Sequence, residues 1–146
     1  MSPSNKKKYI THSEEETFNL AKTVAQSLMG NEVILLKGKL GSGKTIFTKG
    51  IASGCGLNDI DQVCSPSYVL INIYKAKYNI YHIDLYRLDN ESEFQDLGWE
   101  DFLDRGIIIF EWAQKLEYNF TNAIEVDISI GENEERHITI KRKVQV

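Results

Sequence analysis

The sequence predicts an α/β domain, and three of its features support that prediction. The apolar run 33–36 is followed by a glycine-rich turn and by a segment, 46–52, whose composition favours a helix. Ahead of this unit, apolar residues recur at helical spacing over 18–28. Near the C-terminal end, residues 123–130 and 137–144 alternate apolar and polar side chains, as half-buried strands do. Helical spacing and two-residue alternation in one chain together favour helices packed on a sheet.

The glycine-rich turn is Gly38-Lys39-Leu40-Gly41-Ser42-Gly43-Lys44-Thr45. It matches G-x-x-x-x-G-K-[ST], the P-loop, at every fixed position, and a strand and a helix flank it as that motif requires. Successive backbone N–H groups and the positive end of a helix dipole form an anion cradle for a phosphate. We therefore predict nucleotide binding, with Lys44 reaching the β/γ oxygens and the Thr45 hydroxyl ligating Mg²⁺.

Length and composition narrow the class of protein. A chain of 146 residues, 42% hydrophobic and 26% charged, fits one globular domain with a proper core. No stretch reaches the length of a membrane span. Residues 1–9 contain Lys6-Lys7-Lys8 without a following apolar region, so we expect a flexible, solvated tail and not a secretory signal.

The net charge and the cysteines bear on the kind of ligand and on the compartment. The net charge of −4 argues against a generic nucleic-acid binder, because such proteins need clustered Lys and Arg side chains. The two cysteines, Cys55 and Cys64, form no C-x-x-C motif. This usage fits a reduced, cytoplasmic protein.

The first helix is predicted to start at Ser13, because Ser13 and Glu16 fit the S-x-x-E capping box. Gly30 is a plausible stop for this helix. The helix after the P-loop is expected to run to about Ser53 and to end at Gly54-Cys55-Gly56. The segment 57–64 is polar and irregular.

Two β-rich runs follow, 69–74 and 79–84, with a hairpin turn expected at 75–77. The segment 89–104 is acidic and predicted to be helical, and its charges are most simply a solvated helix surface. Residues 107–110 form a buried type of strand that ends at Glu111-Trp112. The alternating segments 123–130 and 137–144, joined by a turn at 132–134, are predicted to form an antiparallel hairpin.

Hydrolysis needs a second acid near Mg²⁺, usually at the C-terminal end of a neighbouring strand. Glu111, after four apolar residues, has the Walker-B arrangement, and Asp84 also follows a β-rich run. Ser67 lies between a proline and a tyrosine after the P-loop helix, the position of a hydroxyl residue in the switch segment of other P-loop proteins. His82 alternates to the same strand face as Asp84 and is either a partner of the site or simply a strand histidine; we favour the latter.

Taken together, the chain resembles the TsaE (YjeE) family, the small P-loop ATPases of bacterial tRNA threonylcarbamoyladenosine (t6A) synthesis. The resemblance spans nearly the whole chain and depends on the P-loop, Ser65-Pro66-Ser67-Tyr68, 82–88 (His-Ile-Asp-Leu-Tyr-Arg-Leu), 97–101 (Leu-Gly-Trp-Glu-Asp) and 110–112 (Phe-Glu-Trp). The His-x-Asp-x-Tyr-Arg and Glu-Trp elements after a P-loop are specific, whereas a P-loop alone is not.

This resemblance implies a P-loop NTPase-like three-layer sandwich, whose mainly parallel sheet is extended by a C-terminal antiparallel hairpin, with ATP and Mg²⁺ as ligands. It implies catalytic roles for Lys44, Asp84 and Glu111, and metal ligation by Thr45 and Glu111. The nucleotide-binding residues it implies are Leu40, Gly41, Ser42, Gly43, Lys44, Thr45, Ser67, Asp84, Glu14 and Arg136, and for Arg136 a solvated charge opposite the turn acids is an equal alternative. Ser67 stands where the family usually has threonine, and Lys39 where it usually has aspartate.

The family's role, as the resemblance implies it, is that of an accessory ATPase that binds the TsaD–TsaB pair and supports or resets threonylcarbamoyl transfer to adenosine 37 of tRNA. Contact with tRNA is then indirect, and no membrane is involved. Weak turnover by the isolated protein is expected, because none of the four arginines is placed as an obvious finger.

Three alternatives stay open. A small-molecule kinase shares the P-loop but needs an acceptor pocket and usually an arginine-bearing lid. A small GTPase is disfavoured, because the chain has neither D-x-x-G after the switch strand nor N-K-x-D. A non-catalytic adaptor would use ATP only to set a binding-competent shape.

Overall fold

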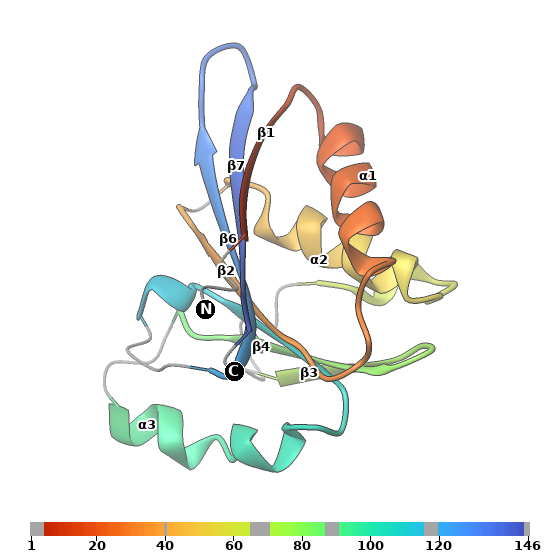
Figure 1. Ribbon diagram of the computed structural model, residues 1–146, viewed down its shortest axis with the longest axis vertical. Coiled ribbons are helices and arrows are strands. Elements are labelled where there is room, and N and C mark those ends of the chain that lie inside the picture. The colour runs from red at the N-terminus through yellow and green to blue at the C-terminus, as the bar shows by residue number, and fades with distance from the viewer. Residues whose placement is uncertain (1–4, 40, 65–70, 87–90, 116–119, 145–146) are drawn as a thin grey trace.

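A seven-stranded sheet runs through the described part of the molecule in the order β1-β7-β6-β2-β5-β4-β3 (Figure 1). The computed structural model describes residues 5–39, 41–64, 71–86, 91–115 and 120–144. The strands are β1 (Asn5–Thr11), β2 (Val33–Gly38), β3 (Ile71–Lys75), β4 (Asn79–Asp84), β5 (Ile107–Glu111), β6 (Asn122–Ile130) and β7 (Arg136–Val144). The four central strands are parallel neighbours, and antiparallel pairs extend the sheet at both edges.

Helices cover both faces of this sheet. They are α1 (Glu14–Ala25), α2 (Lys44–Gly54) and α3 (Glu91–Asp96), with short 3-10 helices at Ile60–Gln62, Trp99–Phe102 and Ala113–Lys115. Figure 1 shows α1 and α2 together on one side of the sheet and α3 on the other. In the described part of the chain, no helix is both long and apolar enough to cross a membrane.

The residues of β2 and β5 divide between the two layers with period two. Ile34 and Leu36 lie in the core under α1 and α2, whereas Val33 and Leu35 lie in the core that contains Phe94 of α3. In β5, residues 107 and 109 face the first core and residues 108 and 110 face the second. Such strands are buried on both faces, which explains their continuous apolar sequence. The predicted α/β class and its three layers are confirmed.

The topology brings three chain segments to one edge of the sheet. β2 lies between β6 and β5, and β5 lies between β2 and β4, all parallel. Their C-terminal ends therefore meet at the same edge, where β2 leads into the P-loop and Glu111 and Asp84 are register partners. In open α/β sheets, this is where ligands bind.

Close packing of α1 on α2 fixes the helix that follows the P-loop. A Cβ atom added at Gly50 would lie 2.5 Å from the Ala21 Cβ, and one at Gly54 would lie 2.5 Å from the Ala25 Cβ. Only glycine at these positions lets the two backbones come so close.

The expected flexible tail over residues 1–9 is wrong for residues 5–9, which belong to β1. This strand pairs with β7 in an antiparallel register from Asn5↔Arg142 to Thr11↔Arg136. Its three lysines are typical of an edge strand, where charge prevents pairing with other chains. Because lysine is common both in tails and at sheet edges, the sequence alone did not separate the two.

Two helix boundaries also differ from expectation. α1 starts after Ser13 as predicted, and the Ser13 hydroxyl accepts from the Glu16 N–H at 3.1 Å, but the helix ends at Ala25 and not near Gly30. The backbone N–H groups of residues 29, 30 and 31 donate instead to the buried Glu32 carboxylate, which replaces helix bonds there. The predicted helix over 89–104 is broken by Gly98, whose φ of +71° starts a separate 3-10 helix.

The other predicted strands are confirmed where the structure describes them; residues 69 and 70 of the predicted run 69–74 lie outside the described residues, and the segment predicted to be irregular contains the 3-10 helix Ile60–Gln62. β3 and β4 form the expected hairpin around residues 75–79, and all five residues of β5 are buried. β6 and β7 pair in an antiparallel register from Asn122↔Val144 to Ile130↔Arg136.

Candidate nucleotide-binding site

The P-loop connects the end of β2 to the start of α2 through a backbone that only glycine adopts easily. Gly41 and Gly43 have φ angles of +79° and +112°, and Gly43 is the N-cap of α2. Gly38 is required for space, because an added Cβ would lie 2.5 Å from the Ser42 Oγ and 2.7 Å from the Ile128 carbonyl oxygen. The loop thus directs backbone N–H groups and the N-terminus of α2 into one cradle.

The Lys44 ammonium lies folded over this loop. Its Nζ donates to the carbonyl oxygens of Gly38 and Lys39, each at 2.9 Å, and lies 4.1 Å from the centre of the Trp112 ring. Burial lowers the pKa of Lys44, and the negative charges of Glu111 and Asp84 oppose that shift. Since an ammonium carries three N–H groups, Lys44 can keep both loop bonds and donate a third to a phosphate oxygen.

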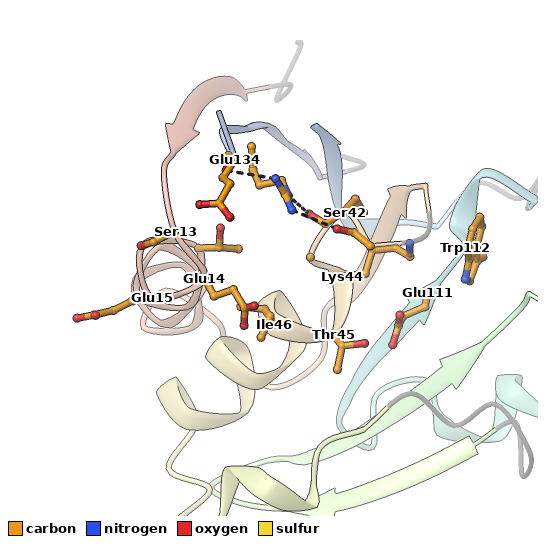
Figure 2. A pocket seen from close by; sticks show the side chains of 14 residues that line it. Ser13, Glu14, Glu15, Ser42, Lys44, Thr45, Ile46, Glu111, Trp112 and Glu134 are labelled. Carbon is orange, nitrogen blue, oxygen red and sulfur yellow. Dashed lines mark hydrogen bonds between the residues drawn. The ribbon is translucent and has the colours of Figure 1, made fainter. Parts of the chain in front are cut away.

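A cavity of about 770 Å³ opens over the P-loop, a volume in the range of small-molecule sites. Four segments line it: the start of α1, the P-loop with the start of α2, the end of β5, and the β6–β7 hairpin. Figure 2 shows the Thr45 hydroxyl and the Glu111 carboxylate directed toward the same space. Beside the P-loop, the cavity therefore presents the Lys44 ammonium, the Thr45 hydroxyl and the Glu111 carboxylate to a ligand.

The two acids at the sheet edge are both buried. Glu111 is 3% exposed and Asp84 is 4% exposed, and they are register partners on β5 and β4. Asp84 accepts from the Tyr86 backbone N–H at 2.9 Å, which fixes its carboxylate at the end of β4. Glu111 belongs to the cavity lining, whereas Asp84 lies beside it.

These groups fit Mg²⁺ bound together with a nucleotide. The Thr45 hydroxyl and two carboxylates are hard oxygen ligands, which Mg²⁺ prefers, and it commonly takes its other ligands from water and phosphate. Among the described residues, no three His, Cys, Asp or Glu side chains gather into a metal site. The buried Ser42 hydroxyl, for which the described protein offers no hydrogen-bond partner, adds a further polar atom at the cradle. The donor set thus suits a metal that arrives with the phosphates.

Comparison with known proteins identifies the family. A profile described as "Threonylcarbamoyl adenosine biosynthesis protein TsaE" matches residues 11–143. This chain belongs to the TsaE family. The TsaE protein of Rickettsia typhi is 40% identical over 138 residues, covering 92% of this chain and 94% of that protein. The TsaE protein of Aquifex aeolicus is 37% identical, covering 94% and 97%.

A solved structure supports the same assignment. The crystal structure of Bacillus subtilis YdiB superposes with a TM-score of 0.73 at 29% identity, covering 95% of this chain and 86% of that one. The resemblance to TsaE and the P-loop NTPase-like fold are both confirmed.

The structure brings most of the predicted site residues of this TsaE chain together. One cavity is lined by Glu14, Gly41, Ser42, Gly43, Lys44, Thr45, Glu111 and Arg136. Leu40 and Ser67 lie outside the described residues. Nucleotide contact by any of the predicted residues stays a prediction.

Arg136 comes from the far end of the chain and braces the P-loop. Its Nε donates to the Ser42 carbonyl oxygen at 3.0 Å, and its Nη2 to that of Gly41 at 3.3 Å. Its Nη1 contacts the carbonyl oxygens of Glu134 and Glu135 within its own hairpin. The side chain therefore lies on backbone oxygens of the loop instead of only facing the acids of the turn.

Sequence reasoning missed two contacts of the site. His82, for which a simple strand role was favoured, is fully buried and contacts the Glu111 carboxylate through Nε2. Gln114 donates to the Gly38 carbonyl oxygen at 3.2 Å. The period-two spacing of His82 and Asp84 was a usable signal for the first contact, but the sequence around Gln114 carries none.

Proposed function

We propose that this protein is a cytoplasmic, Mg²⁺-dependent ATPase that acts in t6A formation on tRNA. In this proposal it binds the TsaD–TsaB pair, and its ATP cycle supports or resets threonylcarbamoyl transfer. The observation that carries the proposal is the arrangement of Lys44 and Thr45, at the start of α2, facing Glu111 across one cavity. Membership of the TsaE family supports the pathway.

Each side chain has a role that its position supports. The P-loop amides and Lys44 hold the β- and γ-phosphates and withdraw charge from the leaving group. Thr45 and Glu111 hold Mg²⁺, which when bound neutralises charge on the phosphate oxygens. Asp84, beside Glu111, orients the attacking water, and burial of both carboxylates keeps their positions fixed.

The positions of the described arginines support activation by a partner. Arg136 is held by carbonyl oxygens of the P-loop, and Arg142 pairs with Glu32 at 3.1 Å. Arg105 is exposed in the segment between Phe102 and β5, and Arg87 lies outside the described residues. None of the three described arginines is free beside the cavity, so we expect the partner surface to supply a cation for the charge that develops in the transition state, as arginine fingers do in other P-loop proteins.

The deciding experiment measures ATP hydrolysis with and without purified TsaD–TsaB from the same cell, for the wild type, Lys44→Ala and Lys22→Ala. Lys22 is exposed near the end of α1 and serves as the matched control. We expect weak turnover alone, stimulation by the pair, loss in Lys44→Ala and no loss in Lys22→Ala. Turnover that ignores the pair but responds to a small-molecule acceptor would overturn the proposal in favour of a kinase.

A further inference from the structure

Behind Glu111, two polar side chains cross an otherwise apolar layer. The Nδ1 of His82 lies 2.9 Å from the Tyr74 hydroxyl, and its Nε2 contacts the Glu111 carboxylate. The Tyr74 hydroxyl donates to the Cys64 carbonyl oxygen at 3.3 Å. His82 is fully buried and Tyr74 is 3% exposed, so the contacts of His82 with Tyr74 and Glu111 are shielded from water.

The sheet register explains how residues distant in sequence meet here. Tyr74 pairs with Ile80 across β3 and β4, and His82 lies two residues farther along β4. His82 in turn pairs with Ile109 on β5, and Glu111 lies two residues farther along that strand. Steps of two keep all three polar side chains on one face of the sheet, in diagonal contact.

Burying these polar side chains lowers the stability of the folded protein, because their surroundings are mostly apolar. Apart from Asp84 beside Glu111, their neighbours on this face of β4 and β5 are Ile80, Ile107 and Ile109, all fully buried in the core under α1 and α2. Burying a histidine and a carboxylate there costs desolvation that apolar side chains of similar volume would avoid. A gain in folding stability alone is therefore a poor explanation for Tyr74 and His82.

We propose that Tyr74 and His82 form a relay, anchored on the Cys64 carbonyl, that holds the Glu111 carboxylate in the orientation needed to ligate the nucleotide-bound metal. This inference depends on the proposed function and makes Tyr74 and His82 positioning residues. Asn72, on the same face of β3 as Tyr74, also donates to the Cys64 carbonyl, at 3.2 Å, so two side chains hold the anchor. Burial raises the pKa of Tyr74, so its hydroxyl keeps the proton that it donates to Cys64.

Two substitutions of His82 separate its two contacts. The amide nitrogen of Asn overlies Nδ1 of histidine and that of Gln overlies Nε2, so His82→Gln can keep the Glu111 contact and His82→Asn cannot. Tyr74→Phe removes only the hydroxyl. Tyr78→Phe is the matched control, because the Tyr78 hydroxyl donates to the Leu28 carbonyl oxygen, also at 3.3 Å, from the same hairpin but away from Glu111.

The measurement is the ratio of the ATP dissociation constants with EDTA and with saturating Mg²⁺, for the full chain. We expect His82→Asn to reduce this ratio about tenfold, the scale on which partners of metal ligands act, and Tyr74→Phe to reduce it about threefold. His82→Gln, which keeps the Glu111 contact but loses the contact with Tyr74, should reduce the ratio about threefold, as Tyr74→Phe does, whereas Tyr78→Phe should keep the wild-type ratio. A general loss of structure would instead change both constants together.

A double variant tests whether the two residues act as one unit. Because Tyr74 acts through His82, Tyr74→Phe combined with His82→Asn should reduce the ratio no further than His82→Asn alone. Independent, multiplying reductions would contradict a single relay.

The outcomes distinguish the relay from the proposed function. If the wild type shows no Mg²⁺-dependent ATP binding, both fail. If it does and all four single variants match it, only the relay is refuted. Thermal unfolding, monitored by circular dichroism, checks that each variant is folded. If the His82 variants do not fold, the comparison of Tyr74→Phe with Tyr78→Phe decides whether the relay exists.

Discussion

The Arg136 guanidinium donates to the Ser42 carbonyl oxygen at 3.0 Å, joining the β6–β7 hairpin to the P-loop across 94 residues of sequence. A second bond to the Gly41 carbonyl oxygen makes the contact a two-point brace. Because the glycines of this loop leave its backbone free to adopt many conformations, an external brace helps to keep its amides directed at a phosphate.

Arg136→Ala should therefore weaken ATP binding. We expect the dissociation constant to rise about tenfold, as losing charge-assisted hydrogen bonds of this kind costs about 1.5 kcal/mol. Arg136→Lys should recover only part of the loss, because an ammonium lacks the planar fork. Equilibrium titration measures the effect, with Arg105→Ala as an exposed control; equal affinity of Arg136→Ala and wild type would contradict the brace.

Glu111→Gln should separate nucleotide binding from turnover. Turnover should fall on the order of 100-fold, because the metal and water lose a charged partner in the transition state. ATP affinity in EDTA should stay or rise, since one negative charge near the phosphates is removed. Glu125→Gln, which alters a carboxylate paired with Lys37 and Lys143 outside the cavity, is the control.

This same variant tests the adaptor alternative. If Glu111→Gln abolishes hydrolysis while t6A formation with TsaD–TsaB continues, turnover is dispensable and the adaptor function is favoured. Loss of both activities supports the ATPase.

Ser13→Ala should destabilise the protein by about 1 kcal/mol, the usual cost of removing a helix N-cap. The hydroxyl satisfies the Glu16 N–H, and the Glu16 carboxylate accepts from the His12 N–H at 2.8 Å. Urea unfolding measures the change. Thr23→Ala removes a hydroxyl that only duplicates a helix bond, at the Asn19 carbonyl, and should be nearly neutral; equal effects of the two variants would contradict the capping role.

Gly50→Ala should destabilise the protein although alanine favours helices. The new Cβ would lie 2.4 Å from the Phe18 carbonyl oxygen, so α1 and α2 must separate, at a cost of about 1–3 kcal/mol. Thermal unfolding should show a lower midpoint than wild type. Ser53→Ala, on the same helix, improves helix propensity without this clash; a Gly50→Ala protein as stable as Ser53→Ala would refute the packing argument.

The two cysteines should differ in reactivity. Cys64 is exposed, whereas Cys55 is buried and burial raises the pKa of its thiol to about 11, so it stays protonated at neutral pH. Since the thiolate is the nucleophile, a chromogenic disulfide reagent should titrate one thiol in the native protein and two in urea. Cys64→Ser should leave no fast native reaction, and two fast thiols in the native wild type would be inconsistent with the fold.

The sequence alone was sufficient to predict the features that depend on local pattern. The P-loop, the buried strand ending at Glu111, and the β3–β4 and β6–β7 hairpins all follow from residue spacing within short segments. Helix ends and edge strands were less predictable, because they depend on distant partners. α1 stops early where Glu32 takes over the backbone N–H groups, and β1 is a strand only because β7 pairs with it.

The site shows the same division. The identities of Lys44, Thr45, Glu111 and Asp84 as candidates came from the sequence, because a phosphate cradle and a strand-end acid have recognisable local patterns. Only the tertiary structure decided that Arg136 braces the loop and that His82 contacts Glu111, since strand order and register set those contacts. The local sequence around Arg136 or His82 does not determine these contacts, because the partners are brought together only when the sheet is complete.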